Sequence, residues 1–244
     1  MKITFVGTGD AFGSGGRFHT CFNLETGGQR ILVDCGASTL VAMNSMGMER
    51  RGIDAIVLSH LHGDHIGGLP FLLLECQFVT GRKEPLIIVG PPGTRQRVHE
   101  LTEAMFPGAV ASCSGFLVDF VELEPGSRTE VLGIGVESFL VIHPSGAPAT
   151  GLRISHGGKV FAYSGDTCWT DTLVDIARNA DLFVCECFGK DSETPYHLNY
   201  RTLLEKRPLF TARRIMLTHM SPEMLAALDE VEFETAEDGL VVQL

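Results

Sequence analysis

The stretch Ser59-His60-Leu61-His62-Gly63-Asp64-His65-Ile66-Gly67-Gly68 decides how this sequence is interpreted. It follows the apolar run 54–58, so the histidines stand where a predicted strand ends and a loop begins. Histidines two positions apart on extended backbone point to the same side, so His60 and His62 are placed to bind one ion. The chain then turns at Gly63, which lets Asp64 and His65 face a second ion. Imidazole and carboxylate ligands suit zinc, and also manganese or iron.

A solvent-facing polar turn is the alternative interpretation of this segment. Four potential ligands within six residues, directly after an apolar strand, favour the metal site instead. The HExxH pattern of zincin proteases is absent from the sequence, so that class of metalloenzyme is excluded.

Short apolar runs recur between glycine-rich turns over the rest of the chain, and most of them are typical of strands. The predicted strands are Ile3–Val6, Ile31–Val33, Ala55–Leu58, Leu86–Val89, Phe116–Val121, Val136–Ile142, Leu152–Ser155, Val160–Tyr163, Leu182–Glu186, Ile215–Leu217 and Leu240–Val242. The predicted helices are Thr39–Met46, Gly68–Phe78, Thr94–Met105, Asp171–Arg178, Tyr200–Lys206 and Pro222–Leu228. Gly157-Gly158 is expected to form a hairpin turn. Interspersed strands and helices indicate an α/β protein with sheets layered between helices.

Length and composition indicate one domain over residues 1–244, because 244 residues with 44% hydrophobic content can bury a full core. No apolar run is long enough to span a membrane. The first residues read as a strand rather than a leader, so we expect a cytoplasmic protein. The seven cysteines are scattered and odd in number, and this does not predict a disulfide framework (Cys21, Cys35, Cys76, Cys113, Cys168, Cys185 and Cys187).

The formal net charge of −11 argues against a broad surface for polyanions. Proteins that bind long nucleic acids usually carry a basic stripe, whereas the basic clusters here are short, at Arg50-Arg51 and Arg213-Arg214. Two bound dications would make the site itself locally positive. The sequence therefore favours a small anionic substrate over a long nucleic acid.

The histidine cluster resembles the HxHxDH signature of the metallo-β-lactamase superfamily, and four further residues, one before the cluster and three after it, stand in that superfamily's order. Asp34 ends an early strand, His143 follows the run 136–142, Asp166 lies in Tyr163-Ser164-Gly165-Asp166-Thr167, and His219 follows the run 215–218. The resemblance covers almost the whole chain. It implies an α/β fold of the four-layer αββα type.

The resemblance also implies a ligand set for two divalent metal ions, with zinc expected and manganese or iron as alternatives. One ion would be held by His60, His62 and His143, and the other by Asp64, His65 and His219, with Asp166 and a hydroxide bridging them. Asp34 is expected to orient a ligand rather than bind metal.

Within the superfamily, the opening Phe5-Val6-Gly7-Thr8-Gly9-Asp10-Ala11 and the block around Asp166 look most like tRNase Z and its phosphodiesterase relatives. These enzymes place a Glu and a His between the bridging Asp and the last ligand His, which Glu186 and His197 match. The resemblance implies that His197, polarised by Glu186, protonates the leaving oxygen, while Asp64 orients or deprotonates the nucleophile. A surface histidine is the alternative for His197.

One departure from tRNase Z concerns substrate size. The long arm that grips tRNA lies between the third His and the bridging Asp in those enzymes, whereas here His143 and Asp166 are 23 positions apart (166 − 143). The sequence therefore predicts a phosphodiesterase for small or cyclic phosphodiesters.

Three alternatives stay open beside it. They are a lactonase or thioesterase on the same ligand set, a tRNA 3′-processing endonuclease, and a redox or binding-only member of the superfamily. Redox members usually replace the second histidine of the motif with Glu, whereas His62 is intact. A homodimer is what the tRNase Z resemblance implies.

Overall fold

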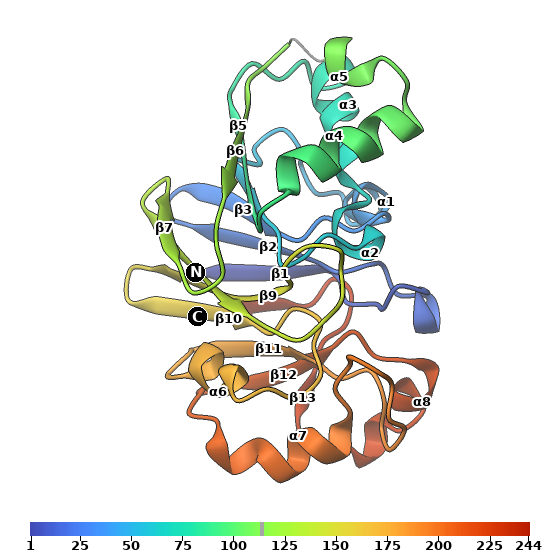
Figure 1. Ribbon diagram of the computed structural model, residues 1–244, viewed down its shortest axis with the longest axis vertical. Helices are drawn as coiled ribbons and strands as arrows, with labels where there is room; N and C mark the ends of the chain where they lie inside the picture. Colours follow the sequence, from blue (N-terminus) through green and yellow to red (C-terminus); the bar gives the residue numbers. More distant parts are fainter. Residues whose placement is uncertain (113–114) are drawn as a thin grey trace.

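Two seven-stranded sheets pack face to face in the computed structural model, which describes residues 1–112 and 115–244 (Figure 1). The first sheet has the order β14-β1-β2-β3-β4-β5-β6. Its strands are β1 Lys2–Gly7, β2 Cys21–Thr26, β3 Gln29–Val33, β4 Ala55–Val57, β5 Leu86–Gly90, β6 Val118–Glu122 and β14 Val241–Gln243. Strands β14 to β3 pair antiparallel, and β3 to β6 pair parallel.

The second sheet repeats this division, with the order β13-β12-β11-β10-β9-β8-β7. Its strands are β7 Arg128–Val131, β8 Ile134–Leu140, β9 Thr150–His156, β10 Lys159–Tyr163, β11 Leu182–Glu186, β12 Ile215–Thr218 and β13 Glu234–Thr235. Strands β7 to β10 are antiparallel, and β10 to β13 are parallel. Each sheet therefore has a parallel half, whose strand ends are natural places for a site.

Helices cover the outer face of each sheet (Figure 1). The helices near the first sheet are α1 Thr39–Ser45, α2 Gly63–Ile66, α3 Leu69–Phe78, α4 Thr94–Met105 and α5 Ala109–Ser112. Those near the second sheet are α6 Thr172–Ala177, α7 Tyr200–Lys206 and α8 Pro222–Leu225. Short 3₁₀ turns complete the chain at η1 Ser14–Gly16, η2 Arg207–Leu209 and η3 Leu228–Glu230.

The side-chain alternation of the strands produces the layers. On β3, Ile31 and Val33 point into the core between the sheets, whereas Leu32 points into the core under the helices of the first sheet. On β11, Val184 faces the inner core and Phe183 faces the core under α6 and α7. Three apolar cores separated by two sheets make a four-layer αββα sandwich, which confirms the predicted fold class.

Most predicted elements are present with boundaries shifted by a few residues. The Gly157-Gly158 hairpin joins β9 to β10, and both glycines have positive φ. The sequence prediction missed β2, β7, β13 and α5, and it predicted a turn at Gly63, where the structure begins the short helix α2.

The cysteines that the structure describes are free thiols, and Cys113 lies outside the described residues. Among the described helices, none has both the length and the apolar character needed to cross a bilayer.

Candidate metal centre

The candidate site lies where strands of both sheets end. His60 comes three residues after β4, and α2 begins at Gly63, so that it carries Asp64 and His65. From the second sheet, Asp166 follows β10 and His219 directly follows β12. The carboxyl ends of parallel strands thus bring together residues more than 150 positions apart in the sequence, as Nε2 of His219 lies 3.3 Å from Oδ2 of Asp64.

Two groups of side chains meet there. In the first triad, His60, His62 and His143, one nitrogen of each residue lies within 4.8 Å of the others. Nδ1 of His62 and Nε2 of His143 are 3.1 Å apart. His60 is fully buried, whereas the other two members are partly exposed, so the triad faces solvent on one side.

The second set consists of Asp64, His65, Asp166 and His219. Oδ2 of Asp166 lies 3.4 Å from Nε2 of His65 and 3.3 Å from Nε2 of His219. The same oxygen lies 3.8 Å from Nε2 of His60 and 4.0 Å from Nε2 of His143. Asp166 therefore stands between the two groups.

Hydrogen bonds on the far side of the rings fix which nitrogen faces the centre. His65 donates from Nδ1 to Oδ2 of Asp34 at 2.7 Å. The Ser59 hydroxyl donates to the same Asp34 oxygen, so its own oxygen accepts from Nδ1 of His60 at 3.1 Å. His143 donates from Nδ1 to the carbonyl of Tyr196 at 3.1 Å. In each ring it is Nδ1 that makes this hydrogen bond, so Nε2 points to the centre.

The donor set fits divalent metal ions. Nε2 of His60, Nε2 of His65 and Oδ1 of Asp166 are buried and make no hydrogen bond to any described group. Buried polar atoms are nearly always hydrogen-bonded, so three unpaired ones that point to the same place indicate a bound ligand. Imidazole nitrogens with carboxylate oxygens are the donors that zinc and related dications prefer. The cluster therefore fits a metal site.

The electrostatics of the cluster differ from ring to ring. Burial lowers the pKa of His60 well below its ordinary value, so this imidazole is neutral and its lone pair is available. Burial also disfavours the charged form of His219, but the charge of Asp166 and the hydrogen bond to Asp64 outweigh it and raise the pKa to about 9. Although burial opposes it, the neighbouring histidines hold the pKa of Asp166 well below its ordinary value. Although burial opposes it, His65 and His219 likewise lower the pKa of Asp64, so two ionised carboxylates, Asp64 and Asp166, face the centre.

Glu186 and His197 lie beside this cluster. Glu186 is fully buried as the last residue of β11, and both of its oxygens lie 3.2 Å from Nδ1 of His197. It also accepts hydrogen bonds from the backbone N–H groups of Thr167 and Leu198. The imidazole ring of His197 stacks on that of His219, with centroids 5.6 Å apart. The ring of His197 also lies 4.9 Å, centroid to centroid, from that of His143, so the pair borders both groups of the cluster.

The charges of this pair are coupled. Burial raises the pKa of Glu186. Burial lowers the pKa of His197, but the hydrogen bond and the charge of Glu186 outweigh it, so that the pKa of His197 is raised. This arrangement favours a proton on His197.

Sequence reasoning did not find two of the residues that support the cluster. Ser59 directly precedes the first histidine of the cluster, and this position is a usable signal. Tyr196 acts through its carbonyl, which no side-chain pattern reveals. Arg153 lies away from the cluster and donates to the carbonyls of Ile176 and Arg178. That contact is structural.

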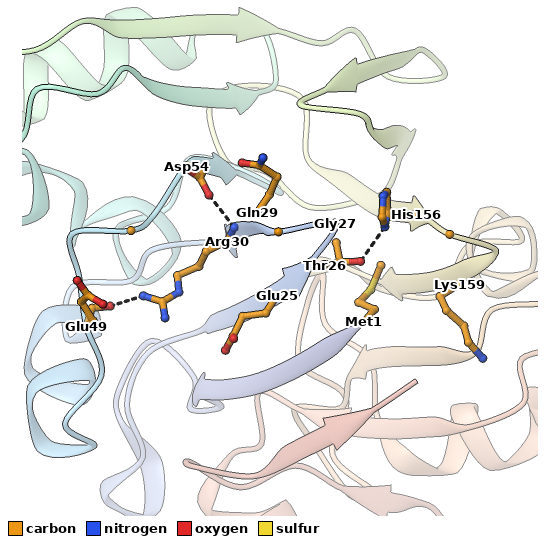
Figure 2. Close-up of a pocket in the computed structure, with 13 residues that line it drawn as sticks. Met1, Glu25, Thr26, Gly27, Gln29, Arg30, Glu49, Asp54, His156 and Lys159 are labelled. Atoms are coloured by element: carbon orange, nitrogen blue, oxygen red, sulfur yellow. Dashed lines mark hydrogen bonds between the residues drawn. The ribbon is translucent and has the colours of Figure 1, made fainter.

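A separate cavity of about 660 Å³ lies near the hairpin turns of β2–β3 and β9–β10 and includes no residue of the cluster (Figure 2). Figure 2 shows His156 pointing to Thr26, with which it shares a hydrogen bond of 2.9 Å. Cationic and acidic side chains alternate around this cavity, so no single ligand chemistry follows from it.

Comparisons with solved structures agree with the fold. YhfI from Bacillus subtilis, a metallo-β-lactamase fold protein, superposes with a TM-score of 0.80 at 22% identity and covers 99% of both chains. The short form of human tRNase Z superposes with a TM-score of 0.79 at 26% identity, covering 100% of this chain and 99% of that one. Together with the site, these likenesses define a metal-dependent hydrolase of the metallo-β-lactamase superfamily, in the branch of tRNase Z and phosphodiesterases.

Sequence comparison narrows the class further. The model of the family described as anti-Pycsar protein Apyc1 matches residues 1–241, and the chain belongs to this family. Ribonuclease Z of Mycobacterium sp. (strain KMS) is 29% identical over 248 residues, covering 97% of this chain and 80% of that protein. Ribonuclease Z of Methanothermobacter thermautotrophicus is 28% identical over 278 residues, covering 91% and 87%. The predicted superfamily and branch are confirmed.

Proposed function

We propose that this protein is a phosphodiesterase that uses two divalent metal ions, with zinc expected, to hydrolyse a small or cyclic phosphodiester. The first triad would hold one ion and the second set the other, with Asp166 shared between them. The single observation that supports a two-ion site most directly is the position of Asp166 Oδ2, within 4.0 Å of ring nitrogens from both groups.

When bound, two such ions lower the pKa of a water molecule toward ~7 and neutralise charge on the phosphate oxygens. The residues of the chain supply the remaining functions. Asp64 lies between His65 and His219 and orients the attacking water or accepts its proton. Asp34, Ser59 and Tyr196 keep the ligand rings in one tautomer.

His197 is the proposed proton donor to the departing alkoxide. Glu186 holds the ring through Nδ1, which leaves Nε2 free for the substrate. Phe188 packs against the same ring with centroids 5.0 Å apart and limits its rotation. Because the ring is already held in place, less conformational entropy is lost when the transition state forms.

The substrate is proposed to be small because the segment between His143 and Asp166 is short. Between His143 and Asp166 the chain forms only β9, β10 and their connections, so it has no arm at the position where tRNase Z grips tRNA. The net charge of −11 also disfavours an extended polyanion. Both observations favour a compact anion that binds at the metal centre alone.

The test is hydrolysis of bis(p-nitrophenyl) phosphate by zinc-loaded protein, beside a lactone and a thioester under the same conditions. Selective turnover of the phosphodiester is expected, and turnover of a cyclic phosphodiester would then define the substrate. Selective turnover of the lactone or thioester would overturn the substrate class and leave the metal site standing.

The second candidate function is tRNA 3′ processing, which is favoured by the similarity to proteins named Ribonuclease Z. A precursor tRNA with a 3′ trailer belongs in the same assay. Cleavage at a rate comparable to that of the small diester would favour this function over the proposed one.

The proposal also takes the chain as one metallo-β-lactamase-like domain over residues 1–244 that acts in the cytoplasm as a homodimer. The resemblance to tRNase Z supports the dimer, and sedimentation velocity at several protein concentrations tests it.

A further inference from the structure

We infer that Asp238 is a positioning residue that holds His219 in its metal-binding conformation through Thr8. Asp238 is not a member of the metal cluster, and it follows β13 near the end of the chain. The inference rests on the proposed role of His219 as a ligand and adds a residue that controls it.

Both carboxylate oxygens of Asp238 are used on one loop, residues 8–20. Oδ1 accepts from the backbone N–H and from the hydroxyl of Thr8, each at 2.8 Å. Oδ2 accepts from the backbone N–H of Phe18 at 2.8 Å. Three hydrogen bonds to an ionised acceptor fix both ends of the loop, and such bonds are about twice as strong as neutral ones.

Thr8 passes this restraint to His219. Thr8 is fully buried, and its carbonyl accepts from the backbone N–H of His219 at 3.1 Å. The Thr218 hydroxyl donates to the same carbonyl at 3.3 Å. Asp238 therefore holds the N–H of Thr8, and the carbonyl of Thr8 holds the backbone of His219.

His219 needs such a restraint because its backbone is strained. Its φ of 57° is left-handed, a conformation that is unfavourable for a non-glycine residue and persists only where the surroundings impose it. In this conformation Nε2 of His219 lies 3.3 Å from Oδ2 of both Asp64 and Asp166. If the Thr8 carbonyl moved, the ring would lose this position.

The same loop also reaches the other side of the second set. A Cβ on Gly36 would lie 2.4 Å from Cβ of His19 and 2.2 Å from the carbonyl oxygen of Asp64, so the loop, Gly36 and Asp64 are in close contact. Among the described residues, no hydrogen bond joins the loop to His60, His62 or His143. Asp238 should therefore control one metal position and leave the other unchanged.

The experiment is zinc binding to the metal-free full chain, measured by competition with a chelating indicator and by metal analysis. Wild type is expected to bind two ions, and His219→Ala should weaken one of them. Asp238→Ala should weaken the same ion by about 10–100-fold, the usual effect of removing a residue that orients a ligand, with the other ion unchanged. Asp238→Asn keeps the shape but loses the charge and should give a smaller decrease.

Glu234→Ala is the matched control, because Glu234 lies on neighbouring β13 and pairs with Arg214 rather than with the loop. It should bind both ions as wild type does. If Asp238→Ala does not fold cooperatively without metal, Asp238→Asn decides the result.

Wild-type affinity for both ions in the folded Asp238 variants would overturn the inference, and so would equal weakening of both ions. Retention of both ions by His219→Ala would instead overturn the proposed ligand assignment.

Discussion

The carbonyl oxygen of Tyr196 accepts a hydrogen bond from Nδ1 of His143 at 3.1 Å, although Tyr196 directly precedes His197 in the chain. One loop therefore positions both the proposed proton donor and a proposed metal ligand. Tyr196 has a left-handed φ of 65°, and its side chain is 50% exposed. The backbone of this residue, rather than its ring, is the part that matters.

Substitution of Tyr196 should show whether its left-handed backbone or its side chain limits stability at this position. Tyr196→Gly accepts positive φ freely and is expected to keep the unfolding free energy and metal loading close to wild type. Tyr196→Val is β-branched and should lower the unfolding free energy by about 1–2 kcal/mol. Urea denaturation of both variants makes the comparison. An equal or larger loss for Gly than for Val would contradict the argument that the left-handed φ limits this position.

Removal of a proposed ligand should remove metal as well as activity. His60→Ala and Asp166→Ala are each expected to lower phosphodiester hydrolysis by more than about 100-fold, beyond the effect of residues that only orient ligands. Metal analysis of the purified variants gives the decisive number, namely ions per chain. Retention of two ions by either variant would show that the ligand assignment is wrong.

The role proposed for His197 depends on the leaving group. His197→Ala should slow hydrolysis of an alkyl phosphodiester by roughly 100–10,000-fold, the usual contribution of a general acid. A nitrophenolate departs without a proton, so the same variant should hydrolyse bis(p-nitrophenyl) phosphate at a rate much nearer to wild type. Equal losses on the two substrates would exclude His197 as the acid.

Asp181 is expected to make stability depend on acid pH. Although burial opposes it, the hydrogen bond from the Val160 N–H at 2.9 Å and the charge of Lys159 hold the pKa of Asp181 below its ordinary value, and Arg213 lies 3.0 Å from its carboxylate. A lowered folded pKa means that the stabilisation is present above the unfolded value of about 3.9 and is lost as pH falls through the folded value.

Asp181→Asn should therefore lower the unfolding free energy by about 1–2 kcal/mol at neutral pH and have little effect at the acid end. Thermal denaturation of both proteins from neutral to acid pH measures this difference. The exposed neighbour Arg178, changed to Ala, is a control for the loss of a surface charge. A constant difference between wild type and Asp181→Asn at all pH values would contradict the prediction.

The sequence was informative where chemistry and periodicity coincide. The apolar run before residues 60–65 predicted that the cluster lies at a strand end, and the order of Asp34, His143, Asp166 and His219 indicated the fold. Strand β2 was missed because it is buried on both faces, so that Asn23 interrupts the apolar run without producing alternation. Helix α2 was missed because four residues are too few to show a helical period.

The support of the site was harder to predict because it depends on long-range backbone contacts. Asp238 is 230 positions from Thr8, and the Tyr196 carbonyl is 53 positions from His143. Hydrogen bonds of this kind depend on where loops end in space. Neither residue has a neighbouring partner in the sequence that would indicate its contact.

The division of the proposed ligands between the sheets has a consequence for how the molecule opens. His60, His62, Asp64 and His65 follow a strand of the first sheet, whereas His143, Asp166 and His219 follow strands of the second. Bound ions would then cross-link the two halves of the sandwich at one edge. Separation of the sheets would have to wait for metal release, so amide hydrogen exchange and proteolysis of the inner strands should proceed at the rate of metal dissociation in the loaded protein and much faster after chelation.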